Sequence, residues 1–236
     1  MEINPIIVIG VPRDGDGDPK AIKTNWQRAE DSGIGCVIIN DDMDTKAASA
    51  AKKAGAYVYV PDHAGEPLNS NYETDSGAER VARSLAKFDR FYNHDIVINV
   101  HAKLPEVAGD VIKASMYPLA DPYVMISTFV VPITEEEAKS EDVVKVQLEI
   151  FPKRRVQVLT NSQIAEVKGF TRKISEAGPG PYYKQVPIYA YRRGALDKFV
   201  RYGPTVREME ENLEPDRALA NGMRVGAVLL NSGMGA

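Results

Sequence analysis

The sequence lacks several features that would assign it at once to a class of protein. Its single cysteine, Cys36, excludes a disulfide within the chain, and its place in the apolar run 36–39 favours a buried position. No apolar run reaches the roughly 20 residues of a membrane-spanning helix, and the N-terminus has no basic leader with a cleavage site. We therefore expect a cytoplasmic protein with no membrane partner.

An excess of basic charge is also absent. The formal net charge is −4 and the sequence pI is about 5.5, which argues against a nucleic-acid partner. Of the three histidines, His63 and His94 have no metal-ligand spacing, so we interpret both as surface residues. With 236 residues and no repeats or low-complexity tracts, the chain is expected to form a single domain, residues 1–236.

Apolar runs alternate with helical segments in the first half of the chain. Strands are predicted at 6–9, 37–39, 57–60 and 95–100. Helices are predicted between them, stopping near Gly33, running from a cap at Asp44 or Thr45 to Ala54, and opening at 76–80. This order indicates an α/β fold with a mainly parallel sheet flanked by helices. Its ligand site should lie where the loops after Ile9, Ile39 and Val100 converge.

The pattern changes near Tyr123. Longer strands are predicted at 123–132, 143–150, 155–159 and 188–191, and a last strand at 225–230. Helices are predicted at 196–202 and at 206–221, the second interrupted at Pro215. We interpret about 123–190 as a smaller antiparallel portion.

Several blocks follow one another in order along the chain: Ser76-Gly77-x-Glu79-Arg80, Ile98-Asn99-Val100 with Pro105, Val131-Pro132-Ile133 with Val144-Lys145-Val146, Ile188-Tyr189-x-Tyr191-Arg192, and Glu208 with Leu213-Glu214. Together they resemble the CMP-Kdo synthetases, which join the cytidylyl group of CTP to 3-deoxy-manno-octulosonate. The resemblance implies a nucleotide-diphospho-sugar-transferase-like fold and a homodimer formed through the antiparallel portion. It also implies a nucleotide and a small acidic acceptor as partners.

The nucleotide side of the resemblance rests on basic residues, which polyphosphate binding demands. It implies nucleotide-binding roles for Arg13, Lys20, Ser76, Arg80 and His101. The loop between Arg13 and Lys20 is nevertheless acidic, with aspartates at 14, 16 and 18. That spacing resembles a calcium loop, but Pro19 and Asn25 stand where glycine and glutamate belong, so a turn-rich acidic loop is the simpler interpretation.

The sharpest departure from the family follows Val100. The chain has His101-Ala102-Lys103-Leu104-Pro105 where the family holds a magnesium-binding aspartate, and nothing after Asp216 is acidic. We therefore predict no metal ligands, with magnesium held only through phosphates. The catalytic candidates are Lys20, Lys103 and His101, because a fixed cation and an acid or base can act there.

The acceptor side has also changed. The resemblance implies substrate-binding roles for Gln185, Tyr189, Tyr191 and Glu214, although Gln185 replaces a histidine and Pro215 a glutamine, and an arginine expected near 160–161 is missing. Three hypotheses follow. The chain is a nucleotidyltransferase with altered metal and substrate sites, a non-catalytic homologue that binds a ligand or protein partner, or a fold repurposed for other chemistry through His101 and Lys103.

Overall fold

The structure is a computed structural model. It describes residues 3–11, 19–35, 37–40, 46–60, 76–102, 104, 108–156, 159 and 162–230. The chain divides into two compact units. Unit 1 comprises Met1–Lys113 and Ala190–Arg201, and unit 2 comprises Ala114–Tyr189 and Tyr202–Ala236. Each unit is described by itself.

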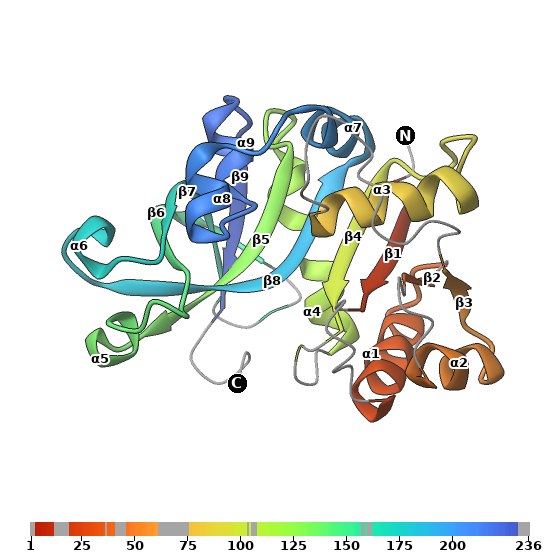
Figure 1. The fold of residues 1–236 in the computed structure, drawn as a ribbon. Helices are drawn as coiled ribbons and strands as arrows, with labels where there is room; N and C mark the ends of the chain where they lie inside the picture. Colours follow the sequence, from red (N-terminus) through yellow and green to blue (C-terminus); the bar gives the residue numbers. More distant parts are fainter. Residues whose placement is uncertain are drawn as a thin grey trace. The chain divides into compact units, whose positions relative to one another are not determined.

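Unit 1 is built on a parallel sheet in the order β3-β2-β1-β4 (Figure 1). Its strands are β1 (Pro5–Gly10), β2 (Val37–Asn40), β3 (Tyr57–Tyr59) and β4 (Ile96–His101). Its helices are α1 (Pro19–Asp31), α2 (Lys46–Lys53), α3 (Gly77–Phe88) and α7 (Arg193–Arg201), with α4 (Gly109–Ala114) at its boundary. The side chains of 6–9 are fully buried, as expected for a parallel strand covered on both faces.

The carboxyl ends of three strands of unit 1 lie side by side. Gly10 of β1 pairs with Asn40 of β2 on one side and with His101 of β4 on the other. Because parallel strands in register end at the same edge, the chain leaves the sheet there three times. The predicted convergence of these strand ends is confirmed.

The start of α3 is fixed by a capping box. The Ser76 hydroxyl accepts from the Glu79 amide (3.3 Å), and the Glu79 carboxylate accepts from the Ser76 amide (2.9 Å). Helix α3 then packs against β1, β2 and α7, while α1 and α2 pack against each other. The helix predicted to open near Ser76 is thus confirmed, whereas the caps predicted for the preceding helix, Asp44 and Thr45, lie outside the described residues.

Unit 2 has the strand order β8-β5-β9-β7-β6 (Figure 1). Its strands are β5 (Ile126–Ile133), β6 (Lys145–Arg155), β7 (Gln163–Thr171), β8 (Tyr182–Arg192, of which the last three residues belong to unit 1) and β9 (Val225–Leu229). Its helices are η1 (Tyr117–Ala120), α5 (Glu135–Ala138), α6 (Ile174–Ala177), α8 (Val206–Glu211) and α9 (Asp216–Ala220). Strands β5 and β9 are parallel, whereas β6 with β7 and β7 with β9 are antiparallel. The predicted antiparallel additions are confirmed.

Two expectations for unit 2 have different outcomes. The strand predicted at 155–159 is wrong, because Arg155 ends β6 and the next strand is β7, whose polar residues hid it in the sequence. The predicted interruption at Pro215 is confirmed, since α8 ends before it and Pro215 is the N-cap residue of α9. Proline has no amide hydrogen to continue a helix from the preceding turn.

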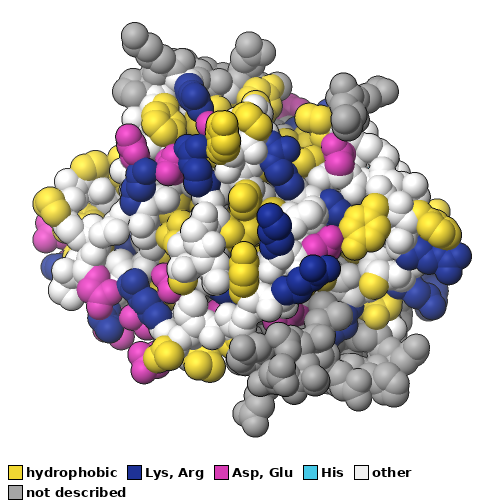
Figure 2. Space-filling model, turned by 90° about the horizontal axis from the view of Figure 1, so that it is seen from above, with side chains coloured by type: hydrophobic (Ala, Val, Ile, Leu, Met, Phe, Trp, Pro, Cys, Tyr) yellow, Lys and Arg dark blue, Asp and Glu magenta, His cyan; other side chains and the backbone are white. Residues whose placement is uncertain are grey.

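The surface carries both signs of charge. On the face in Figure 2, basic and acidic side chains are interspersed over most of the area. None of the described helices is long and apolar enough to cross a membrane. His94 is less exposed than predicted: its side chain is 18% exposed, and its Nδ1 lies 3.1 Å from the buried carboxylate of Asp89. His63 and Cys36 lie outside the described residues.

Candidate functional site

One nucleotide-side candidate of unit 1, His101, lies at the carboxyl end of a strand. His101 is the last residue of β4 and is half-buried, opposite Gly10 at the end of β1. The Ala102 amide donates to the Gly10 carbonyl (3.0 Å), and the Leu104 amide donates to the His101 carbonyl (3.0 Å). These bonds turn the chain sharply after β4 and fix the position of the His101 backbone.

A buried side chain of α1 also holds the segment after β4. Asn25 is 2% exposed, and its Nδ2 donates to the carbonyls of Ala102 (3.0 Å) and Leu104 (3.1 Å). Asn25 therefore ties α1 to the turn that follows His101. The three aspartates of the calcium-loop alternative lie outside the described residues.

The other nucleotide-side candidates lie in first turns of helices. Lys20 is exposed in the first turn of α1, and Arg80 is half-buried in the first turn of α3. Free amide hydrogens and the helix dipole make such positions favourable for an anion. The Ser76 hydroxyl already accepts a bond in the cap of α3. Arg13 and Lys103 lie outside the described residues.

Three of the acceptor-side candidates come together in unit 2. Gln185 and Tyr189 both lie on β8, and Gln185 Nε2 donates to the Tyr189 hydroxyl at 2.5 Å. Gln185 Nε2 also lies 3.5 Å from the Thr128 hydroxyl of β5, which donates to the carbonyls of Val186 (3.2 Å) and Ile188 (3.0 Å). The result is a polar cluster that spans the neighbouring strands β8 and β5.

Glu214, the third candidate, lies close enough to Tyr189 to affect its pKa. Burial, and then the negative charge of Glu214, raise the pKa of the Tyr189 phenol far above its ordinary value, against a smaller lowering by the Gln185 hydrogen bond. Tyr189 consequently stays a neutral hydroxyl at physiological pH. An uncharged phenol, an amide and a nearby carboxylate form a set that can bind the hydroxyl groups of a sugar.

Tyr191, the fourth acceptor-side candidate, belongs to unit 1. Its side chain is 3% exposed, and its ring lies 6.4 Å from that of Phe199 of α7, at an angle of 57°. This packing gives Tyr191 a place in the core of unit 1. A substrate-binding role for Tyr191 stays a prediction.

Glu214 is carried by a short turn between α8 and α9, residues 212–215, which we call the Glu214 turn. Its first residue, Asn212, is left-handed with φ 51°, and Leu213 is buried. The Arg172 side chain, which follows β7, donates through Nε to the Glu211 carbonyl (2.5 Å) and through Nη2 to the Asn212 carbonyl (3.2 Å), so it satisfies the last carbonyls of α8.

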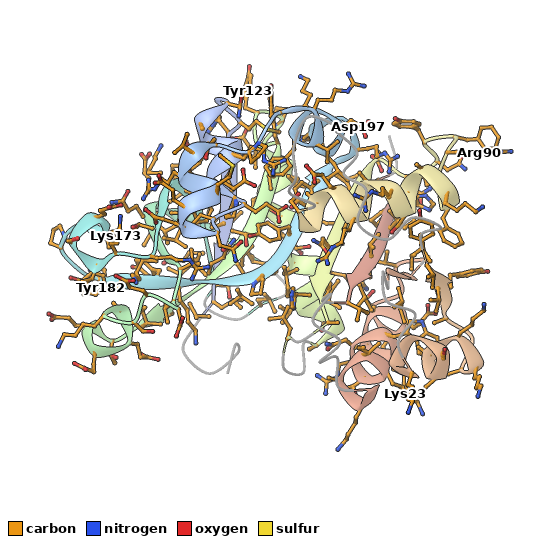
Figure 3. All side chains as sticks on the ribbon, in the orientation of Figure 1. Lys23, Arg90, Tyr123, Lys173, Tyr182 and Asp197 are labelled. Atoms are coloured by element: carbon orange, nitrogen blue, oxygen red, sulfur yellow. The ribbon has the colours of Figure 1, made fainter. Side chains whose placement is uncertain are left out.

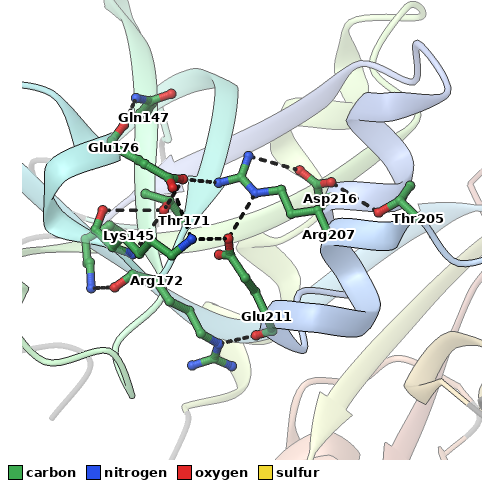
Figure 4. A network of polar contacts seen from close by, with 10 residues as sticks. Lys145, Gln147, Thr171, Arg172, Glu176, Thr205, Arg207, Glu211 and Asp216 are labelled. Atoms are coloured by element: carbon green, nitrogen blue, oxygen red, sulfur yellow. Dashed lines mark hydrogen bonds and ion pairs between the residues drawn. The ribbon is translucent and has the colours of Figure 1, made fainter.

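Ion pairs extend around this turn (Figure 4). Lys173 pairs with Glu211 (3.3 Å), and Arg207 pairs with Glu176 (2.8 Å) and Asp216 (3.8 Å). Most of these side chains are partly exposed, so each pair contributes little by itself. Together with Arg172 they join α8 to β7 and α6.

Sequence reasoning missed Thr128, Arg172 and Arg217 of the acceptor side. The Thr128 hydroxyl is fully buried. Its only signal in the sequence was a polar side chain within the apolar strand β5. The roles of the two arginines depend on carbonyl and carboxylate groups far away in the sequence, which no spacing rule reveals.

A metal site formed by protein side chains finds no support in the part of the chain that the structure describes. Within it, no group of three or more His, Cys, Asp or Glu side chains is placed to hold an ion. Lys103 and the residues after 230 lie outside the described residues.

Comparisons with known proteins agree with this fold. The chain is 36% identical to a 3-deoxy-manno-octulosonate cytidylyltransferase of Methylobacterium sp. (strain 4-46) over 217 residues, 91% of this chain and 79% of the relative. It is 33% identical to the enzyme of that name from Paramagnetospirillum magneticum, over 98% of this chain and 91% of the relative. No family model matches the sequence.

Solved structures show the same fold. A CMP:2-keto-3-deoxy-manno-octonic acid synthetase complexed with CTP superposes with a TM-score of 0.74 at 22% identity, over 97% of this chain and 90% of that one. A mannose-1-phosphate geranyltransferase from Thermus thermophilus superposes with a TM-score of 0.61 at 12% identity, over 97% and 75% of the two chains. The expected α/β fold, a mixed sheet flanked by helices, is confirmed, and the identities of 33–36% over most of the chain show that it belongs to the CMP-Kdo synthetase (3-deoxy-manno-octulosonate cytidylyltransferase) family.

Proposed function

We propose that this protein is a nucleotidyltransferase that transfers the cytidylyl group of CTP to an acidic sugar of the 3-deoxy-manno-octulosonate type. The observation that carries the proposal is the cluster of Gln185, Tyr189 and Glu214 in unit 2. Its neutral donors and single carboxylate suit a polyhydroxylated acceptor, and the relatives described above are named as cytidylyltransferases of such an acid.

The reaction defines what the nucleotide side must supply. A hydroxyl oxygen of the acceptor attacks the α-phosphorus of CTP, a new phosphorus–oxygen bond forms, and the bond to the β-phosphate oxygen breaks to release pyrophosphate. Positioning and neutralisation of phosphate charge account for most of the catalysis of such transfers. We assign this neutralisation to Arg13, Lys20, Arg80 and Lys103, with Ser76 at the start of α3, and proton transfer to His101.

The lysine at position 103 takes the place of the family's magnesium-binding aspartate. A fixed ammonium group there repels a metal ion and attracts a phosphate. Among the described residues, no three His, Cys, Asp or Glu side chains lie together so that they could hold an ion. Magnesium therefore enters this proposal only as a counterion of the triphosphate.

The acceptor side binds through Gln185, Tyr189, Tyr191 and Glu214. Because its pKa is raised, Tyr189 donates a hydrogen bond rather than presenting a negative charge to an acidic substrate. Glu214 can accept from sugar hydroxyls. The replacement of a family histidine by Gln185 removes a titratable group from this side and predicts binding that changes little between about pH 6 and 8.

The decisive experiment measures pyrophosphate release from CTP with and without 3-deoxy-manno-octulosonate, for the wild-type protein and for Glu214→Gln. We expect release that requires the acceptor, and a Glu214→Gln variant with an acceptor KM raised by about tenfold and an unchanged KM for CTP, as expected for the loss of one charged hydrogen-bond acceptor. Glu210→Gln, an exposed carboxylate of α8, is the matched control and should behave as wild type.

The outcome also separates the two alternatives. CTP that binds without any release of pyrophosphate favours a non-catalytic homologue. Turnover of a different phosphate or sugar compound that His101→Ala and Lys103→Ala abolish favours a repurposed fold. Either result refutes the proposed transfer.

We further propose a homodimer formed through the antiparallel portion, about 123–190. Its support is a groove of about 590 Å³ in unit 2, the β6–β8 groove. Apolar side chains make up most of its lining, among them Val146, Leu148 and Tyr183, together with the polar Lys145, Gln147 and Lys168. Tyr182 also lines it, at the end of β8 that lies beside α6 (Figure 3). Apolar, aromatic walls of this kind are typical of interfaces. A mass near 26 kDa by light scattering, that of one chain, would refute the dimer.

The proposal treats both units as parts of one functional domain, residues 1–236. It also places the protein in the cytoplasm, since CTP is made and consumed there.

A further inference from the structure

Arg217 is the largest fully buried side chain of the described residues, and it lies three positions after Glu214. Its side chain is 0% exposed. Nε and Nη2 donate to the two carboxylate oxygens of Glu208 at 2.8 and 2.5 Å, and Nη1 donates to the Tyr202 carbonyl at 3.3 Å. Arg217 thus joins α9 to the first turn of α8 and to the chain before it. We call this bidentate pair the Arg217–Glu208 clamp.

The clamp joins the two helices that flank the Glu214 turn, α8 and α9. The turn begins with the left-handed Asn212, and its hydrogen bonds include Leu213 N to the Glu208 carbonyl (3.2 Å) and Arg217 N to the Glu214 carbonyl (3.2 Å). Both partners of the clamp are therefore also backbone partners of the turn. Helices α8 and α9 have 6 and 5 residues, too short to be stable without outside support.

Stability alone does not explain why an ion pair is buried at this position. Taking both charges out of water costs nearly as much as the pairing returns, and apolar side chains of similar size often stabilise a protein equally well. What only the planar guanidinium provides is direction, because two parallel hydrogen bonds fix the distance and the rotation between α8 and α9. The clamp therefore determines where Glu214 lies.

Glu208 has a second contact that makes this fixation rigid. Its carboxylate accepts from the Thr205 amide (3.3 Å), and its own amide donates to the Thr205 hydroxyl (2.9 Å), so it completes the capping box of α8. On the other side of the turn, Arg172 holds the carbonyls of Glu211 and Asn212. Arg172 and the clamp thus restrain the turn at its beginning and at its end.

We propose that Arg217 is a positioning residue for acceptor binding, which holds the carboxylate of Glu214 in place through the bidentate pair with Glu208. The inference rests on the proposed function. Arg217 is buried and does not touch the substrate. It acts through the turn, so its loss affects the acceptor and leaves the nucleotide side unchanged.

The test separates positioning from stability with three variants. Arg217→Lys keeps the charge without the fork, and Arg217→Met leaves Glu208 unpaired. In the double variant Glu208→Gln with Arg217→Met, no buried charge remains, while glutamine still serves the capping box. Arg154→Met, which removes an exposed surface pair with Asp121, is the matched control of unit 2.

We expect the double variant to recover the wild-type unfolding midpoint while its acceptor KM stays raised by about ten- to a hundredfold, the range for a misplaced binding group, with the KM for CTP within about twofold. Arg217→Lys should show the same split at a temperature below its own midpoint. If the double variant recovers both the wild-type unfolding midpoint and the wild-type acceptor KM, Arg217 has a structural role alone and the proposal is overturned.

Failure of the proposed function is distinguishable from failure of the clamp. A wild-type protein that releases no pyrophosphate refutes cytidylyl transfer. In that case hydrogen exchange of the amides of 212–217 reads the clamp directly. Faster exchange there in the double variant, with unchanged exchange in β5 and β9, supports fixation of the turn, and unchanged exchange overturns it.

Discussion

Substitution of Lys145 by methionine is expected to destabilise unit 2 by about 2–4 kcal/mol. Lys145 begins β6 and is 1% exposed, and its ammonium group donates to the carbonyls of Ser140 (2.8 Å), Val143 (3.0 Å) and Arg172. Burial lowers the pKa of Lys145, so keeping the charge inside has a cost that the three carbonyls offset.

The magnitude follows from the groups that the substitution leaves behind. Methionine keeps most of the apolar contact of the lysine chain but donates no hydrogen bond. The Ser140 carbonyl still accepts from the Val143 amide at 3.3 Å, whereas Val143 and Arg172 lose the donor that Lys145 provides. Two partly buried carbonyls without that donor cost at most about 1–3 kcal/mol each, and the removed desolvation cost of the ammonium group reduces their sum.

The assay is urea unfolding followed by far-UV circular dichroism. Trp26 is the single tryptophan and lies in α1 of unit 1, so its fluorescence follows the other unit in the same sample. Lys139→Met is the matched control, because Lys139 is 57% exposed and only pairs with Glu136 on the surface. The reasoning is refuted if the free energy of unfolding of Lys145→Met lies within about 0.5 kcal/mol of that of the control. The three hydrogen bonds would then stabilise the protein by no more than burial of the ammonium group destabilises it.

Two further predictions concern a carboxylate and a glycine of unit 2, the second with a glycine of unit 1 for comparison. Arg224 and then Lys168 lower the pKa of Glu166 below its ordinary value of 4.5, so this carboxylate contributes stability above that pH that is lost as the pH falls through the lowered pKa. Glu166→Gln should therefore cost roughly 1 kcal/mol at about pH 7 and almost nothing at about pH 2, as measured by urea unfolding at both pH values; an equal cost at both would contradict the ion pairing. Gly226→Ala should destabilise by about 1–3 kcal/mol, because its Cβ would lie 2.6 Å from that of Pro118, whose ring cannot turn away. Gly194→Ala in α7, whose Cβ would meet nothing within 4 Å, should instead raise the thermal midpoint, and the opposite order of the two variants would disprove the packing argument.

The alternation of apolar runs and helical segments was sufficient to predict the strands β1 to β4 of unit 1 and the helices between them, but not α4. Fully buried parallel strands such as β1 consist of consecutive aliphatic residues, and Gly10 and Ser76 mark a strand end and a helix start by local chemistry. Their signals are local, because each depends on residues within a few positions. For the same reason the break at Pro215 was predictable.

Unit 2 was less predictable because its strands pair with residues far away in the sequence. Strand β7 carries polar residues and was missed, yet it lies between β6 and β9, whose pairing supplies its hydrogen bonds. Its apolar residues are too few to mark a strand by themselves. The sheet, and not the sequence pattern, decides its conformation.

The site divides in the same way. The sequence by itself determined the family, and its ordered motifs are the basis for proposing the basic residues of the nucleotide side and Gln185, Tyr189 and Glu214 of the acceptor side. Only the tertiary structure decided that Gln185 bonds to Tyr189, that Asn25 serves the turn after β4, and that Arg217 is buried on Glu208. The physical reason is that a hydrogen bond depends on the distance and angle between two groups, and folding sets these for residues that the sequence keeps apart.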